Sequence, residues 1–312
     1  MRRFFHHDKP EERAAADECR DRAARGEALL EAGGLPLNAQ ERLSRQSAAG
    51  AHGARLPWSS NLGVGEFLTT RALQFEVLGQ VLGTSIYHVA YNVMQSQQYG
   101  DSELATYSRA LYDARDRALG RLRQEAALLG AHGVVGVRLE QKGYEWGEHL
   151  IDIVAVGTAV RLPDAPPLER PFLSVLSGQE TWELLQAGYT PVGVALGCCC
   201  YYVMTTWDDE WRKRNWSNGE MVHYTAGIYA ARHGATGRMA AEGQAMGADG
   251  IVGSGVALRI HDITANRARP YSNETETVED HIVEFTAVGT AIAVIGRGHE
   301  PSDAALVLDL GR

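Results

Sequence analysis

The sequence predicts an α+β fold made of two tandem copies of one small domain, in which a long helix covers a small, mainly antiparallel sheet. The main observation is an internal duplication, because Ala114–Gly136 aligns without a gap on Ala231–Gly253 with 11 of 23 positions identical. Unrelated segments of ordinary composition would share about one or two positions. A second block is also duplicated, because Glu148–Val160 aligns on Asp280–Ile292. The shared order of strand, long helix, strand, hairpin and strand indicates a tandem duplication.

Residues 1–55 precede the duplication and are predicted to form an N-terminal helical arm. They are rich in Ala, Arg, Glu and Asp, and the stretch Glu11–Ala32 should be a helix that ends at the pair Gly33 and Gly34. Its apolar residues are mostly alanine, so the helix would be marginal in isolation. Two interpretations remain open, a frayed and solvated arm or an arm that docks on a neighbouring subunit.

The two copies set the expected domain boundaries. The first repeat spans 56–162 and the second repeat spans 172–296, and a chain of 312 residues with 45% hydrophobic content commonly forms two domains. Between them lies PDAPPLERP, at 163–171, which reads as a Pro-rich linker with restricted φ angles. Residues 297–312 form a C-terminal tail.

The strands and loops of the repeats differ in length at two places. The first strands are expected at Phe75–Val89 and Tyr189–Met204, and the last strand of each repeat contains AVGTA. The second repeat has three extra residues before its helix and 15 more in its hairpin, which we expect to be loop insertions. The first of these regions carries Trp207, Trp211 and Trp216 among charged residues. These indoles are either core anchors or contacts for a protein partner.

The long helix of each repeat places a carboxylate within its apolar stripe. Around Ala118, the stripe on the helical wheel consists of Tyr107, Leu111, Ala114, Leu122 and Leu129. Glu125 and its equivalent Glu242 fall inside the stripe, where an unpaired carboxylate would cost several kcal/mol. Candidate partners are Arg121 and Arg238, backbone amides, or a basic group of another domain. Each acid then locks helix to sheet or subunit to subunit, or it serves as a catalytic or ligand-binding acid.

Glycines on the long helices carry two further predictions. Gly120 and Gly237 lie on the face opposite the stripe, where glycine costs roughly 1 kcal/mol relative to alanine. A domain or subunit contact across that face would explain them, and simple tolerance of an exposed glycine is the alternative. Gly130 and Gly247 follow the helices as C-caps, so GAHGVVG and GADGIVG are not nucleotide-binding loops, which join a strand to the following helix.

The last strand of each repeat begins with a repeated pattern of acids and histidine. The residues are Glu148, His149 and Asp152 in the first repeat and Asp280, His281 and Glu284 in the second. Side chains alternate along a strand, so each pair of acids shares one face while the histidine points to the other. We expect a polar face turned toward water or a lumen. A hard-metal site is the alternative, and it would need ligands from another strand or subunit.

The cysteines indicate a reduced protein and supply the candidates for a soft-metal site. Cys198, Cys199 and Cys200 are contiguous and Cys19 stands alone, which is unsuited to a disulfide framework. Alternation places Cys198 and Cys200 on one face, where thiolates could bind zinc or copper(I). The first repeat has no cysteine at these positions, so buried, reduced cysteines that pack as small hydrophobes are the default interpretation.

Composition narrows the partners and the compartment. A net charge of −9 and dispersed basic residues argue against a nucleic-acid surface. No apolar run approaches a membrane span and the N-terminus lacks a signal-peptide pattern, so we expect a cytoplasmic protein. Nucleophile-elbow, Walker, zincin and paired-acid motifs are absent from the sequence, which favours a non-enzymatic role that requires no cofactor.

The assembled pattern resembles the YbjQ family, also called UPF0145, a group of small bacterial proteins with a heavy-metal-binding label. AR..AL.RL..EAALLGAHGVVGVRLE followed by AVGTAV carries the resemblance, and AR..A..RM..E...MGADGIVGSGVAL with AVGTAI repeats it. The second repeat departs by its long hairpin and by Ser254 where the first has Val137. The resemblance implies a dodecin-subunit-like βαββ fold whose domains form a five-membered ring around a barrel or tunnel. It assigns no metal ligands.

Three functional hypotheses follow. The leading one is a non-enzymatic, ring-forming homo-oligomer, in which the repeated Glu, the outer-face Gly and the polar strand are assembly or lumen features. The second is a protein that binds or sequesters a soft metal through Cys198 and Cys200, with histidines from a neighbouring subunit. The third is an enzyme that acts at a subunit interface through Glu125 or His149.

Overall fold

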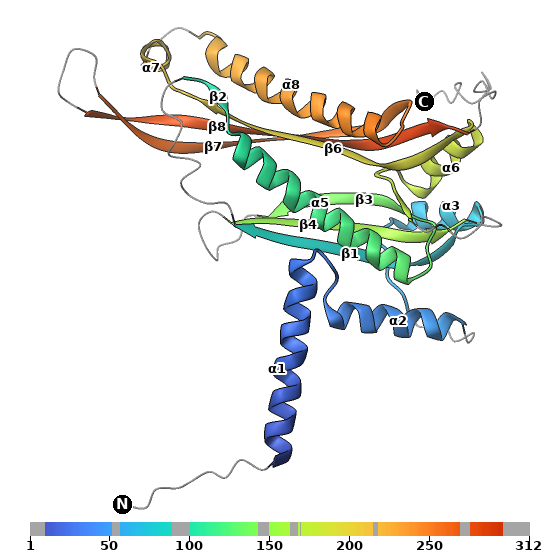
Figure 1. Cartoon of the computed structure of the whole chain (residues 1–312). Helices are drawn as coiled ribbons and strands as arrows, with labels where there is room; N and C mark the ends of the chain where they lie inside the picture. The colour runs from blue at the N-terminus through green and yellow to red at the C-terminus, as the bar shows by residue number, and fades with distance from the viewer. Residues whose placement is uncertain are drawn as a thin grey trace, which may run out of the picture.

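The computed structural model has two four-stranded sheets together with helices, which confirms that the fold is α+β (Figure 1). The residues that it describes are 10–51, 57–88, 100–142, 150–162, 168, 170–214, 218–268 and 275–295. Each repeat contributes one strand, one long helix and a two-stranded hairpin, in that order. The two halves therefore have the same succession of main elements.

The first sheet is built mainly from the first repeat. Its strands are β1 (Glu76–His88), β3 (Gly133–Lys142) and β4 (Leu150–Arg161), and the long helix α5 (Ala105–Leu128) packs on them. The strand order is β1-β4-β3-β5, and both pairings of β4 are antiparallel. The edge strand β5 (Phe172–Leu173) belongs to the second repeat and pairs with β3 in parallel.

The second sheet shows the reciprocal exchange. Its main strands are β6 (Tyr189–Val203), β7 (Gly250–Ala268) and β8 (Thr275–Val294), and α8 (Val222–Ala245) packs on one side. The order is β2-β6-β8-β7, and its edge strand β2 (Ser102–Glu103) comes from the first repeat. Each repeat therefore adds a short strand to the sheet of the other, and α5 lies between the two sheets (Figure 1).

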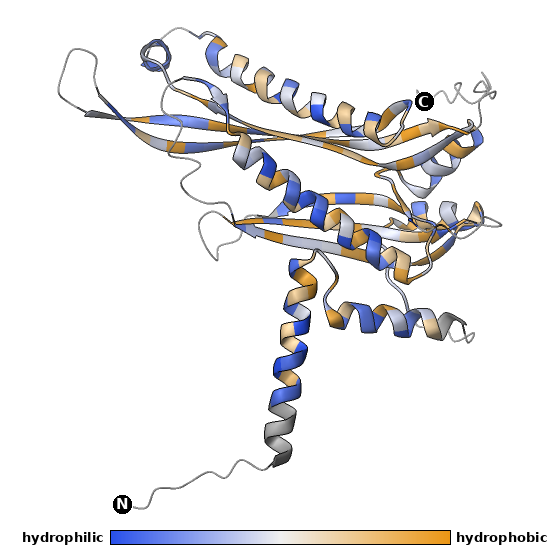
Figure 2. Cartoon of the chain, viewed as in Figure 1, coloured by the Kyte–Doolittle hydropathy of each residue, from blue (hydrophilic) through white to orange (hydrophobic). Residues whose placement is uncertain are grey.

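The core follows the predicted helix stripe. Tyr107, Leu111, Ala114, Ala118, Leu122 and Leu129 are all buried, which confirms the stripe in the first repeat. Hydrophobic residues are concentrated in the strands, whereas α1 is mostly hydrophilic (Figure 2). Gly83 in β1 allows α5 to approach closely, because a Cβ there would lie 1.9 Å from the carbonyl oxygen of Ala118. Gly197 in β6 has the same role, with a Cβ 2.0 Å from the oxygen of Ala235.

The N-terminal arm contains two helices. The first, α1 (Pro10–Glu31), confirms the predicted helix and extends away from the sheets (Figure 1). The second, α2 (Leu37–Ala51), packs its buried Leu43 against the core beside α5. The expectation of a solvated arm is corrected for the second helix only, because Leu35 and Leu43 are 3% and 0% exposed within this one chain. Residues 17–31 of the first helix are mostly exposed, and docking of the arm on a neighbouring subunit stays a prediction.

Short helices complete the fold. α3 (Val64–Ala72) precedes β1 and α6 (Gly178–Gln186) precedes β6. α6 begins with a capping box of Ser177 and Glu180, whereas at α3 only the N–H of Gly63 donates to Glu66. α7 (Trp207–Arg214) occupies the tryptophan-containing insertion. Trp207 and Trp211 are 50% and 66% exposed, so they are not core anchors. Trp216 lies outside the described residues.

The hairpin insertion of the second repeat forms strand rather than loop. β7 and β8 are 19 and 20 residues long, against 10 and 12 residues for β3 and β4. The expectation of a loop is therefore wrong for most of the inserted residues. Near the tip, Arg267 donates to the carboxylate of Asp280 and to the carbonyl oxygen of Thr205, and these bonds hold the long hairpin against the end of β6.

Candidate assembly interface and pocket

The outer edge of β6 is capped by the first repeat. The backbone N–H of Leu104 donates to the carbonyl oxygen of Cys200 at 2.8 Å, and the N–H of Cys200 donates to the hydroxyl of Ser108 at 2.9 Å. Ser102 pairs with Tyr202 through the short strand β2. Edge strands expose unpaired backbone groups, so this capping removes a site for unwanted pairing and joins the repeats.

A buried ion pair also joins the repeats. Arg115 of α5 donates to Glu284 of β8 at 3.0 Å and to Gln141 of β3 at 2.8 Å. The side chains of Arg115 and Glu284 are 4% and 2% exposed. Burial by itself raises the pKa of Glu284, but His261, Arg115 and Gln141 hold it below its ordinary value. Glu284 is therefore an ionised, structural carboxylate.

The two stripe carboxylates act on equivalent backbone groups. Glu125 accepts from the N–H of Leu82 at 2.9 Å, and Glu242 accepts from the N–H of Leu196 at 2.6 Å. Arg42 of α2 donates to Glu125 at 3.2 Å, whereas Glu242 accepts from the hydroxyl of Tyr112 and lies within the electrostatic influence of Arg123. Burial raises the pKa of both Glu125 and Glu242, and these backbone bonds oppose that rise. Each acid locks its helix to the edge of its own sheet.

The repeated arginines bind carbonyl oxygens of the same edges. Arg121 donates to Thr84 at 2.5 Å and Arg238 donates to the equivalent Cys198 at 2.7 Å. Arg238 also pairs with Glu103 at 2.6 Å, whereas Arg121 binds carbonyl oxygens of the arm. Neither arginine partners the stripe acid of its own helix. Gly120 and Gly237 face open space in this single chain.

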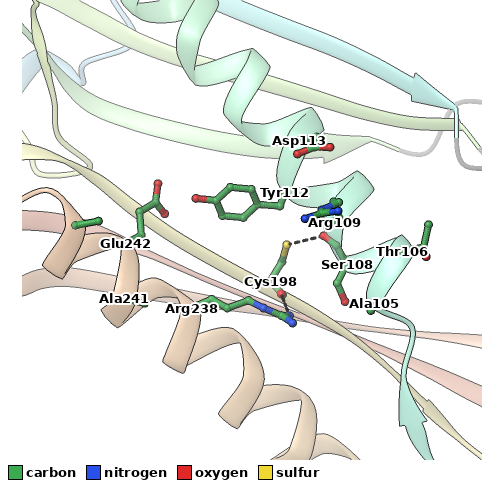
Figure 3. A pocket seen from close by; sticks show the side chains of 11 residues that line it. Ala105, Thr106, Ser108, Arg109, Tyr112, Asp113, Cys198, Arg238, Ala241 and Glu242 are labelled. Atoms are coloured by element: carbon green, nitrogen blue, oxygen red, sulfur yellow. Dashed lines mark hydrogen bonds between the residues drawn. The ribbon is translucent and has the colours of Figure 1, made fainter.

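A pocket of about 880 Å³ opens between α5, α8 and β6 (Figure 3). Tyr112 points across it toward Glu242, and Arg238 lies on the wall below them. At the equivalent place on the first repeat, the arm is bound instead, since Arg42 reaches Glu125 and the carbonyl oxygen of Gly34 receives Arg121. The pocket is therefore the counterpart of the site that the arm fills.

The cysteines do not fit a soft-metal site. Cys198 and Cys200 are buried beneath α5, and the thiol of Cys198 donates to the carbonyl oxygen of Ser108 at 3.4 Å. Burial raises the pKa of both thiols and raises that of Cys199 to about 11, which disfavours the thiolate that binds metal. Among the described residues, no group of three His, Cys, Asp or Glu side chains could hold a metal ion.

The acids of the last strands are buried rather than water-facing, which corrects the expectation for them. Asp152, Asp280 and Glu284 are 3%, 0% and 2% exposed. Asp280 accepts from the hydroxyl of Tyr202, the backbone N–H of Thr205 and the guanidinium of Arg267. His281 pairs with Asp262 at 2.7 Å. Glu148 and His149 lie outside the described residues.

Sequence reasoning missed the residues that join the repeats. Arg115 was hidden because its partner lies 169 positions away, and Ser108 because a helix-facing hydroxyl has no pattern of its own. His223 was also missed, although it lies between Asp101 and Asp209 at 2.7 and 2.6 Å. The usable signal was the retention of Arg115 and Ser108 as Arg232 and Thr225 in the second repeat.

Comparison with known proteins places the chain in a family. Residues 71–163 match the YbjQ family model described as "Putative heavy-metal-binding". The chain is 38% identical over 104 residues to a UPF0145 protein of Halobacterium salinarum, covering 31% of this chain and 98% of that protein. It is 36% identical over 93 residues to a UPF0145 protein of Thermus thermophilus, covering 29% and 80%. The chain belongs to the YbjQ-like UPF0145 family, as the resemblance indicated.

One relative matches most of the chain, including both repeats. The encapsulin nanocompartment protein Rv1762c of Mycobacterium tuberculosis is 34% identical over 275 residues, which cover 86% of this chain and 95% of that protein. Among the described helices, none is both long and apolar enough to cross a membrane.

Proposed function

We propose that this protein is a non-enzymatic, self-assembling scaffold whose copies join head to tail in a closed homo-oligomer in the cytoplasm. Each chain supplies two dodecin-subunit-like βαββ units, defined by 56–162 and 172–296. The proposal draws support from the relative named as an encapsulin nanocompartment protein. The exposed Trp207 and Trp211 are the proposed contact for a further protein partner.

One observation carries the proposal: equivalent surfaces of the two sheets are covered in one repeat and bare in the other. On β6, Leu196 and Cys200 are 2% and 0% exposed because α5 lies over them. On β1, the equivalent Leu82 and Ile86 are 43% and 56% exposed. Apolar residues on an uncovered sheet edge favour association.

The two long helices, α5 and α8, also differ in how much of their surface is buried. Eleven residues of α5 are buried, because α5 packs on its own sheet and on β6. In α8 only four residues are buried, all of them Gly or Ala. Within the chain, α5 packs on β6. The equivalent surfaces, the outer side of α8 and the outer side of β1, do not pack on each other within the described residues of the chain. Contacts of this head-to-tail kind close into a ring when the rotation per step permits, and the family resemblance favours five-fold symmetry.

Sedimentation velocity of the metal-free protein over a wide concentration range tests the proposal. We expect a discrete species whose mass is an integer multiple of 34.0 kDa and persists on dilution. A monomer at every concentration would overturn the proposal. An open-ended distribution of sizes would contradict closure.

A further inference from the structure

The edge of β6 has backbone partners from both repeats. The second repeat supplies two of them, with Glu242 on the N–H of Leu196 and Arg238 on the carbonyl oxygen of Cys198. The first repeat supplies the rest, with Ser108 and Leu104 on the N–H and carbonyl oxygen of Cys200. The β2 strand then continues the sheet at Tyr202 and Tyr201.

From Leu82 onward, the described partners of the β1 edge come from its own repeat, whereas nearer its start Gln46 of the arm donates to the carbonyl oxygen of Leu78. Glu125 receives the N–H of Leu82, and Arg121 donates to the carbonyl oxygen of Thr84. Alternate residues of a strand direct their backbone groups to the same side, so the N–H and carbonyl oxygen of Ile86 also point outward. Within the part of the chain that the structure describes, no group binds them. Ile86 stands where Cys200 stands in β6.

The groups missing from the β1 edge are present at the start of α8, where no described residue binds them. Thr225 supplies a hydroxyl in place of Ser108, and Met221 supplies an N–H in place of Leu104. The backbone geometry is repeated, since Leu104 has φ −83° and ψ 74° and Met221 has φ −81° and ψ 76°. The geometry that lets Leu104 reach Cys200 is therefore also present at Met221. Nearby Val222 is 62% exposed.

Arg115 and Glu284 form the ion pair of the internal interface, and among the described residues their equivalents, Arg232 and Asp152, form no ion pair. Arg232, the equivalent of Arg115, is exposed on α8. Asp152, the equivalent of Glu284, is 3% exposed, and its side-chain contact among the described residues is Thr84 Oγ1 at 3.5 Å. A nearby cation stabilises a buried carboxylate. A second copy that docks as α5 docks on β6 brings Arg232 to Asp152.

At the other edge of each sheet, a short segment is paired in one repeat and its counterpart is unpaired in the described sheets of the other. The segment 172–176 adds to the edge of β3 through Phe172, Leu173 and Ser174. Its counterpart, 58–62, is held in the same way: Ser60 bonds Thr158 at 2.9 Å as Ser174 bonds Thr290 at 3.2 Å. The segment 58–62 is not paired in any described sheet, and β7 has β8 as its only strand neighbour there.

We infer that one copy of this chain places α8 on the β1 edge of a second copy, whose segment 58–62 extends the first copy's sheet at β7. Thr225 and Met221 cap Ile86 of the second copy, and Arg232 pairs with its Asp152. This inference rests on the proposed function, because it names the surfaces through which copies assemble.

A charge swap tests the inference by native mass spectrometry of the full chain. Arg232→Asp should raise the concentration at which copies dissociate by at least about 30-fold, because it places two acids together at a desolvated contact. Adding Asp152→Arg to the same chain should restore assembly. The control is Arg25→Asp on α1, an equal change of charge on an exposed residue that neither proposed contact includes, and it should leave the mass unchanged.

A cross-link provides a second measurement that does not depend on how a buried Asp152→Arg change folds. In a Cys19→Ser background, Thr225→Cys and Ile86→Cys together should give disulfide-linked chains under mild oxidation, whereas either change alone should not. An oligomeric wild type whose mass is unaffected by Arg232→Asp and whose paired cysteines do not link would overturn this inference and leave the proposed function standing. A monomeric wild type would overturn both.

Discussion

Removing the charge of Arg115 should destabilise the fold by about 3 kcal/mol. The pair is desolvated, with Arg115 and Glu284 side chains 4% and 2% exposed, so it falls in the range of about 3 to 5 kcal/mol for a broken buried pair. The lower end applies because Gln141 still donates to the second carboxylate oxygen of Glu284 at 3.2 Å. Arg115→Met leaves the first oxygen buried without its donor.

The assay is urea unfolding at pH 7 of Arg115→Met, of Glu284→Met and of the double variant. The double variant should recover most of the loss, because apolar replacement of both partners leaves no buried charge unpaired. Arg161→Met is the matched control, since Arg161 and Glu76 form a 2.7 Å pair that is 40% and 56% exposed and should be worth less than about 1 kcal/mol. A loss at Arg115 no larger than that of the control would show that burial adds nothing to this ion pair.

The pH dependence of the same pair has a defined sign. The pKa of Glu284 is lowered in the fold from an ordinary value of 4.5. Its stabilisation is therefore complete above that value and is lost as the pH falls through the lower folded pKa. The advantage of the wild type over Glu284→Gln should shrink in that acidic range.

Three other variants give separate tests. In thermal unfolding, His223→Gln should cost about 1 kcal/mol at pH 6 and less at higher pH. Burial lowers the pKa of His223, but Asp209 and Asp101 hold that pKa above 6.5. The stabilisation by the protonated His223 is therefore lost as the pH rises through the folded pKa. Glu242→Gln should be more stable than the wild type at pH 7 by up to about 1 kcal/mol, since burial raises the pKa of Glu242, and the gap should close as the pH falls toward 4.5. Equilibrium dialysis against zinc, copper(I) and cadmium should give equal uptake by the wild type and by a Cys198→Ser, Cys200→Ser variant; uptake that depends on the two thiols would restore the metal hypothesis.

The elements with a strong local period were predictable from the sequence. The apolar stripe through Leu111, Ala118 and Leu122 predicted the buried face of α5. The aligned positions of Glu125 and Glu242 predicted that both acids have the same structural role. The helix ending before Gly33 was predictable because glycine adopts the positive φ found there.

The contacts between repeats were not predictable in the same way. A two-residue strand such as Ser102–Glu103 has no period, and the sequence does not say whether a strand edge pairs with its own repeat or with the other. The burial of Asp152 and Glu284 depends on which elements pack over the sheets. The alternation of side chains along a strand gives the face on which a residue lies but not the element that covers that face. The packing of α2 on α5 depends on one leucine, Leu43, and one distant ion pair to Glu125.

Electron cryomicroscopy of the assembled protein tests the central claim most directly, because it locates each repeat relative to its neighbours. We predict that the start of α8 lies on the β1 edge of the next copy, with Arg232 paired to the Asp152 of that copy, and that the contact has the geometry of α5 on β6 within each chain. An assembly in which β1 meets β1 across a two-fold axis, or in which the β1 edge stays open, would contradict the account.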